Sequence, residues 1–256
     1  GLGRYLDLHG FTNRFEILSR HLNRVSEMVK GYGLEPMIWS DMFFRLQLEG
    51  RYLSYDDPNV ITPEIAALVP EGVELVYWDY FTNYKEGCNN MMVNHNHFGR
   101  PIWFAGGTLT WNGFTPHNHL AQRNWEIATE CCRENGIDNV IVTCWGDDGN
   151  ETSKFAVLPT LFYVAELYRG NTDKEDIKRK FKELFGVGFD DFMKLDYPNS
   201  PYEEKYHCYS PDRNLFYNDP LLPIFDDLLN EEAEGWVENY HRFRDELAAM
   251  SDLEEF

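Results

Sequence analysis

The amino-acid sequence predicts an α/β fold built from parallel strand–helix units. Four short apolar runs are typical of strands in a parallel sheet, and they lie at residues 37–40, 73–78, 102–105 and 140–144. Segments with helical spacing separate these runs, as expected when helical crossovers join parallel strands. Each run leads to an aromatic residue near its C-terminal end, and three of them also lead to a carboxylate. The sequence therefore predicts a functional site at the carboxyl edge of a parallel sheet.

Helices are expected before, between and after these strands. The first should begin after Asn13, because Asn13 and Glu16 form a capping-box pattern, and it should end near Gly31. The run 140–142, which is Val-Ile-Val, predicts a strand buried on both faces. Pro159 should kink its helix or mark that helix's true first turn. Further helices are expected at residues 64–68, 86–98, 118–135, 153–168, 173–184, 221–229 and 231–250.

The number of units predicts half of a barrel. Four strand–helix units end near residue 170, whereas a complete (β/α)8 barrel needs roughly 250 residues. An open doubly wound sheet is disfavoured, because no strand is followed by a Gly-x-Gly-x-x-Gly turn. We therefore expect residues 1–170 to form the C-terminal half of a TIM (β/α)8 barrel and residues 171–256 to form a helical appendage. Two parallel edge strands would need cover, from a homodimer, from a missing N-terminal half or from the helical tail.

Charge and composition exclude several classes of partner. The 256 residues include 23 Lys and Arg against 43 Asp and Glu, a net charge of −20, which argues against nucleic-acid and anionic-membrane binding. Five cysteines without Cys-x-x-Cys spacing favour reduced thiols and a cytoplasmic location. The sequence shows no signal peptide, no membrane span and no cofactor motif. Because the chain opens Gly-Leu-Gly without a methionine, we expect a fragment.

Pairs of an aromatic residue and a carboxylate are the strongest candidates for a site. Tyr77 with Asp79, and Trp145 with Asp147, are two residues apart, so each pair should lie on one face of its strand. A ring covers the apolar face of a sugar while a carboxylate accepts its hydroxyls. The alternative is a purely structural role, in which these rings fill the core of a barrel. Three further strand-end residues complete the candidate set: Trp39, Asp41 and Trp111.

The histidine pairs are weak candidates for a metal site. His95 and His97 are expected on a helix, where residues two apart point in different directions, and His117 and His119 on a loop. Core or solvated histidines are therefore favoured over zinc. A metal-dependent hydrolase using Asp147, Asp148 and the histidines remains a weaker alternative, and we expect no metal.

Taken together, four segments resemble glycoside hydrolase family 20, the exo-β-N-acetylhexosaminidases. They are Met-Ile-Trp-Ser-Asp-Met-Phe-Phe-Arg-Leu at 37–46, Tyr-Trp-Asp-Tyr at 77–80, Gly-Gly-Thr-Leu-Thr-Trp-Asn-Gly-Phe at 106–114 and Cys-Trp-Gly-Asp-Asp-Gly at 144–149. The resemblance covers about residues 1–170 and, more loosely, the helical tail. It implies glycans ending in N-acetylhexosamine as substrates and a retaining, substrate-assisted hydrolysis in which the acetamide oxygen attacks the anomeric carbon.

The resemblance also implies roles for individual residues. Tyr77 would hydrogen-bond the acetamide carbonyl as charge develops, and Asp79 and Asp147 would hold sugar hydroxyls. The remaining aromatic residues would surround the sugar, with Trp145 beneath the ring and Trp39 and Trp111 around the acetamide methyl group.

Two departures from the family pattern limit what this chain is expected to do. The Asp-Glu pair that orients the acetamide and supplies the general acid has no counterpart at any strand end here, and Asp245-Glu246 lies in the tail. Asp147 also stands where the family more often has Glu. This chain alone is therefore expected to be inactive, and a non-catalytic carbohydrate-binding module is the main alternative.

Overall fold

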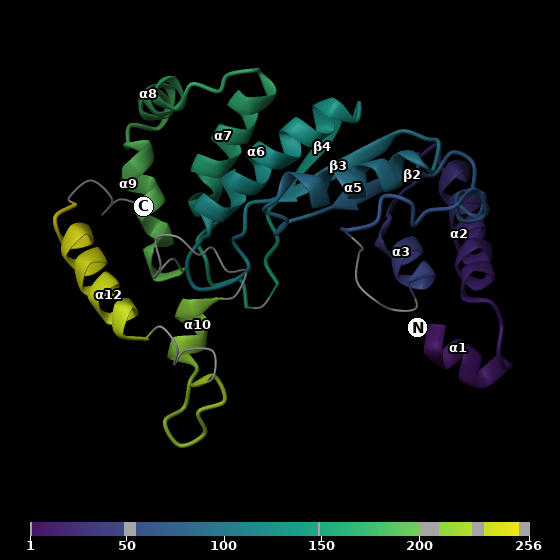
Figure 1. The fold of residues 1–256 in the computed structure, drawn as a ribbon, viewed down its shortest axis with the longest axis horizontal. Helices are drawn as coiled ribbons and strands as arrows, with labels where there is room; N and C mark the ends of the chain where they lie inside the picture. The colour runs from purple at the N-terminus through teal and green to yellow at the C-terminus, as the bar shows by residue number, and fades with distance from the viewer. Residues whose placement is uncertain (1, 49–54, 148, 200–209, 227–232, 251–256) are drawn as a thin grey trace. The chain divides into compact units, whose positions relative to one another are not determined.

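The computed structural model describes residues 2–48, 55–147, 149–199, 210–226 and 233–250. Within these ranges the chain forms the strands β1 (Met37–Trp39), β2 (Glu74–Trp78), β3 (Ile102–Gly107) and β4 (Asn139–Thr143). Helices precede, separate and follow the strands (Figure 1): α1 (Leu2–His9), α2 (Arg14–Gly31), α3 (Asp41–Gln47), α4 (Pro63–Ala66), α5 (Lys85–Asn96), α6 (Asn118–Glu134), α7 (Leu158–Tyr168), α8 (Lys174–Phe185), α9 (Phe189–Met193), α10 (Pro211–Phe216) and α12 (Ala233–Ala248). Two 3-10 helices are η1 (Lys154–Val157) and η2 (Lys194–Asn199).

The four strands form one parallel sheet in the order β1-β2-β3-β4. Ile38 pairs with Leu75 in β2, and Tyr77 pairs with Phe104 in β3. A helix lies in each connection, as parallel pairing requires. The predicted α/β class and its four parallel strands are therefore confirmed, with strand ends shifted by one or two residues.

The outer strands are more exposed than the sequence predicted. All three central residues of β2 are buried, whereas Val140, Ile141 and Val142 of β4 are only half-buried. On β1, Met37 and Trp39 are 42% and 36% exposed. The prediction that 140–142 is buried on both faces was wrong, because β4 is an edge strand of this sheet.

The first predicted helix begins where the sequence placed it. The Asn13 side chain accepts a hydrogen bond from the Phe15 amide at 2.9 Å, which satisfies one of the free N–H groups at the start of α2. Pro159 lies in the first turn of α7, and η1 precedes it as a separate turn. Helix α3 was not predicted, although it buries Phe43 and Phe44 completely.

The chain forms two compact units, each with a core of its own. Unit 1 comprises residues 1–105 and 130–141, and unit 2 comprises residues 106–129 and 142–256. Large side chains that are fully buried in unit 1 include Phe44, Met91 and Phe104. Those of unit 2 include Trp125 and Phe181.

The C-terminal region is helical, but less continuously than predicted. Residues 221–225 form turns rather than the start of the helix expected at 221–229, and residues 227–229 lie outside the described residues. Helix α12 confirms the last predicted helix over residues 233–248. Helices α7 and α8, which flank the predicted boundary at residue 170, both belong to unit 2, and the boundary itself stays a prediction. In the part of the chain that the structure describes, no helix has the length and apolar character needed to cross a membrane.

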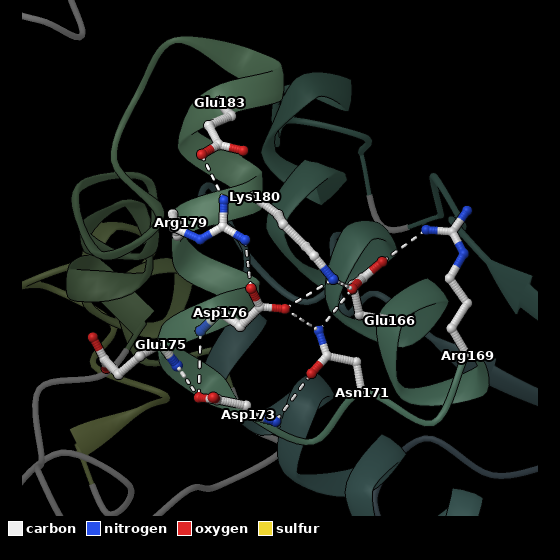
Figure 2. A network of polar contacts seen from close by, with 9 residues as sticks. All are labelled: Glu166, Arg169, Asn171, Asp173, Glu175, Asp176, Arg179, Lys180 and Glu183. Carbon is white, nitrogen blue, oxygen red and sulfur yellow. Dashed lines mark hydrogen bonds and ion pairs between the residues drawn. The ribbon is translucent and has the colours of Figure 1, made fainter.

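A polar network joins the end of α7 to α8 (Figure 2). Its centre is Glu166, whose side chain is 4% exposed and accepts hydrogen bonds from Asn171 at 2.8 Å, Lys180 at 2.9 Å and Arg169 at 2.7 Å. The same Lys180 ammonium group pairs with Asp176 at 2.8 Å. The hydrogen bonds from Asn171, Lys180 and Arg169 lower the pKa of Glu166 to about 2. A buried carboxylate with three donors therefore fixes the angle between two helices of unit 2.

Replacing Glu166 should weaken unit 2 more than replacing an exposed member of the same network. Glu166→Gln keeps the side-chain volume but removes the charged partner of Arg169 and one of the two charged partners of Lys180, so we expect about 2 kcal/mol lower free energy of unfolding in urea at pH 7. The control Glu183→Gln removes a partner of Arg179 that is 62% exposed, and it should cost under about 0.5 kcal/mol. Equal losses in the two variants would contradict the central role of Glu166.

Candidate functional site

Tyr77 and Asp79 meet at the C-terminal end of β2 in unit 1. Both side chains lie on the same face, because residues two apart in a strand point the same way. The Tyr77 hydroxyl donates a hydrogen bond to Asp79 Oδ2 at 2.8 Å. Tyr77 is 1% exposed and Asp79 is 7% exposed. The predicted juxtaposition of this ring and this carboxylate is present, and the pair is buried.

The Asp79 carboxylate is held by donors on both of its oxygens. Its Oδ1 accepts hydrogen bonds from the backbone amides of Phe81 and Thr82, each at 3.0 Å. The Tyr55 phenol is also close enough for the charge of Asp79 to act on it. One phenol and two amides therefore compensate for removing this carboxylate from water. The turn after β2 is fixed by the same group that orients Tyr77.

Burial keeps both phenols neutral and able to donate. Desolvation, followed by the charge of Asp79, raises the pKa of Tyr77 well above its usual value. The same two causes raise the pKa of Tyr55. At neutral pH each ring therefore presents an O–H donor rather than a phenolate.

The imidazole ring of His95 stacks on the Tyr77 ring. The two rings stack with centroids 4.4 Å apart and an interplanar angle of 27°. His95 Nδ1 lies 2.6 Å from the Met91 carbonyl oxygen, which only accepts, so Nδ1 carries the proton. Nε2 is then the acceptor for the Ser40 hydroxyl at 2.7 Å. Burial lowers the pKa of His95 to about 4, so this ring is neutral at pH 7.

The two remaining candidates of unit 1 flank Ser40. Trp39 is 36% exposed at the end of β1. The Asp41 side chain is 15% exposed and forms an ion pair with Arg45 at 3.1 Å, one turn along α3. Asp41 is therefore committed to its own helix, whereas the neighbouring Ser40 joins the end of β1 to His95 and so to Tyr77.

In unit 2 the segments that follow β3 and β4 run side by side. The Thr108 amide donates to the Thr143 carbonyl at 3.0 Å, and the Thr110 hydroxyl donates to the Trp145 carbonyl at 3.5 Å. Leu109, which lies between Thr108 and Thr110, has φ of +51° and is fully buried. This conformation costs a residue with a Cβ about 1 kcal/mol, so the surrounding contacts must hold it.

The other three candidates lie on these segments. Trp111 is 7% exposed, Trp145 is 38% exposed and Asp147 is exposed. The prediction that Trp145 and Asp147 share one strand face was wrong, because β4 ends at Thr143 and both residues follow it. An exposed indole and an exposed carboxylate two residues further along the same segment are nevertheless the two kinds of surface that a sugar requires. Asp148, which the metal hypothesis needs, lies outside the described residues.

The histidines take structural positions in the described part of the chain. His95 is buried in α5, whereas His97, which was predicted in the same helix, is the exposed residue directly after it. His117 is buried, and His119 Nδ1 pairs with Asp196 Oδ2 at 2.9 Å. Among the described residues, no three His, Cys, Asp or Glu side chains form a group that could hold a metal ion.

Sequence reasoning missed Tyr55, Ser40 and the role of His95. Tyr55 lies between the predicted strand at 37–40 and the predicted helix at 64–68, and the charge of Asp79, 24 residues downstream, acts on its phenol. The position of Ser40 between the candidates Trp39 and Asp41 was an indication, but serine is common in turns and so does not by itself indicate a site. The contacts of Tyr55, Ser40 and His95 depend on which side chains the fold brings together, and local sequence does not determine this.

Acidification should reveal the burial of His95. The pKa is about 4 in the folded chain and 6.5 in the reference state, so only the unfolded chain binds this proton between those values. The contribution of His95 to the free energy of unfolding is therefore fully present above pH 6.5. It decreases as the pH drops toward 4, by up to roughly 3 kcal/mol. We expect His95→Gln, measured by urea unfolding from pH 7 to pH 4.5, to lose this part of the pH dependence.

A histidine two residues away provides the matched control. His97 is exposed directly after the same helix, so His97→Gln should keep the wild-type pH dependence. If both variants retained the wild-type slope, the burial of a neutral His95 would be refuted.

The comparisons with known proteins give no family for this chain. No protein-family model matches the sequence, and a search of curated proteins finds no match. The resemblance to glycoside hydrolase family 20 therefore rests on the four segments of the sequence that carry it.

Proposed function

We propose that this chain carries the sugar-recognition part of an exo-β-N-acetylhexosaminidase catalytic domain. The observation that supports it most is the Tyr77–Asp79 hydrogen bond at the C-terminal end of a parallel strand. This is the edge at which barrel enzymes assemble their sites. A donor that is neutral, buried and already aimed by a carboxylate suits an acetamide carbonyl oxygen.

The proposed ligands are glycans that end in N-acetylhexosamine. Without sugar, the Tyr77 hydroxyl donates to Asp79 at 2.8 Å. In the proposed complex an acetamide oxygen accepts that hydrogen bond, and Asp79 turns an oxygen toward a sugar hydroxyl. Within unit 2, the exposed Trp145 ring offers a separate stacking surface for the apolar face of a pyranose, and Asp147 offers an acceptor for a sugar hydroxyl.

The half-barrel and its cover are part of the same proposal. The exposed side chains on β1 and the half-buried β4 are consistent with a sheet that continues beyond both edge strands in a (β/α)8 barrel. An N-terminal half of the barrel, or a second copy in a homodimer, would supply that cover. The proposed location is the cytoplasm, from the cysteine pattern.

A non-catalytic carbohydrate-binding module is the second candidate, and one observation favours it. No Asp-Glu pair stands at the end of any of the four strands, so none of these strand ends supplies the family's general acid. General acid catalysis typically contributes ~10²–10⁴-fold to such a hydrolysis. Binding without turnover is thus expected of this chain under either candidate. Hydrolysis of a chromogenic N-acetylglucosaminide by the longest natural form of the protein distinguishes them.

Preference for the acetamide should depend on Tyr77. In an NMR titration we expect N-acetylglucosamine to bind about five- to tenfold more tightly than glucose, the value of one hydrogen bond. Tyr77→Phe should remove most of that preference and leave glucose binding unchanged. The matched control is Tyr84→Phe, a tyrosine of the same unit that is 45% exposed, and it should keep the preference. Failure of the wild-type chain to bind either sugar would rule out the proposed function.

A further inference from the structure

Helix α10 contacts both of the loops of unit 2 that carry Trp111 and Trp145. We call residues 108–117 the β3 loop, which includes Trp111, and residues 144–153 the β4 loop, which includes Trp145. Two consecutive residues at the start of α10, Asp212 and Arg213, each reach one loop. No role was predicted for this part of the C-terminal region.

Asp212 holds the β3 loop. Its Oδ2 accepts a hydrogen bond from the Phe114 amide at 2.9 Å, and its Oδ1 accepts one from the Arg213 amide at 2.6 Å. The side chain is 1% exposed, and this burial raises the pKa of Asp212. Asn199 assists by donating to the Thr115 carbonyl at 2.6 Å. A Cβ at Gly113 would collide with the Asp212 carboxylate, so the backbone of the β3 loop packs directly against the Asp212 side chain.

Arg213 holds the β4 loop. Its guanidinium group pairs with Glu151 Oε2 at 2.7 Å, and the two side chains are 16% and 26% exposed. The Tyr217 hydroxyl lies 3.5 Å from the other oxygen of Glu151. This ion pair is shielded enough to retain much of its strength, unlike a fully exposed pair.

The two loops are also fixed to each other. The Thr152 hydroxyl of the β4 loop donates to the Gly113 carbonyl of the β3 loop at 2.9 Å, and Thr152 is 4% exposed. Phe114 packs edge-on against Phe216 and Tyr217, with each pair of ring centroids 5.5 Å apart. Helix α10 and the two loops therefore form one contiguous contact set within unit 2.

We propose that Asp212 and Arg213 are positioning residues that fix Trp111 and Trp145 for ligand stacking. Asp212 acts on Trp111 through Phe114, three residues along the β3 loop, and Arg213 acts on Trp145 through Glu151, six residues along the β4 loop. A buried carboxylate is a costly way to gain stability, because apolar groups of the same volume often stabilise as well or better. What it adds is one defined loop conformation, which includes the strained Leu109. The identity of the ligand rests on the proposed function, whereas the positioning does not.

The test uses 19F NMR of the whole chain labelled with 5-fluorotryptophan, with signals assigned from Trp→Phe variants. Asp212→Asn keeps the shape but turns an N–H toward an existing donor, so the Trp111 signal should shift or broaden. Arg213→Met keeps the length but removes the ion pair, so the Trp145 signal should do the same. Trp78 and Trp103 of unit 1 should stay unchanged in both variants.

Rescue and control variants distinguish positioning from general damage. The exchange Arg213→Glu with Glu151→Arg should return the Trp145 signal toward its wild-type position. Arg179→Met is the matched control, because Arg179 is 57% exposed and pairs only with residues of α8 among the ion pairs described. It should leave both signals unchanged. Unchanged Trp111 and Trp145 signals in folded Asp212→Asn and Arg213→Met would overturn the proposal. Arg213 is only partly buried, so its variant tests the idea even where Asp212→Asn fails to fold.

Sugar binding provides the second readout and separates the two proposals. If the wild-type chain binds N-acetylglucosamine, Arg213→Met should weaken that binding on the order of tenfold, and the charge exchange should recover it. Unaltered binding together with displaced tryptophan signals would overturn the role in stacking. If the wild-type chain binds no sugar, the proposed function fails, and the tryptophan signals still decide whether Asp212 and Arg213 position the loops.

Discussion

The buried carboxylate of Asp79 is the constraint on which the end of β2 depends. A carboxylate that is 7% exposed must have its oxygens hydrogen-bonded, and the chain meets this need with the Tyr77 hydroxyl and the amides of Phe81 and Thr82. These partners set the direction of the chain after the strand and the orientation of the Tyr77 ring. His95 then stacks on that ring and connects it to Ser40 at the end of β1. One charged group thus couples two strand ends of unit 1.

Much of the fold was predictable because its signals are local. The apolar runs, the Asn13 cap and the position of Pro159 each depend on residues within one or two turns of the chain, and the structure places the corresponding elements within a few residues. The Tyr77–Asp79 contact was also predictable, because a strand puts residues two apart on the same face whatever surrounds it.

The rest depends on contacts between residues far apart in the sequence. Nothing near Tyr55 indicates Asp79 as its partner, and nothing near Asp212 indicates Phe114, 98 residues away. The half-buried state of β4 follows from its place at the edge of the sheet, which its Val-Ile-Val sequence does not reveal. Both units contain the same arrangement, in which a buried carboxylate accepts hydrogen bonds from backbone amides of a loop that carries aromatic side chains.

Amide hydrogen exchange in Asp79→Ala tests this account most directly. The Phe81 and Thr82 amides donate to Asp79, so losing a hydrogen bond to a charged group should speed their exchange by about 10- to 100-fold. The Glu74 amide at the other end of β2 donates to the Pro36 carbonyl at 3.0 Å and serves as the internal reference, with its protection retained. Equal exchange rates for Phe81 and Thr82 in the wild-type and variant proteins would contradict the claim that Asp79 holds this end of the strand.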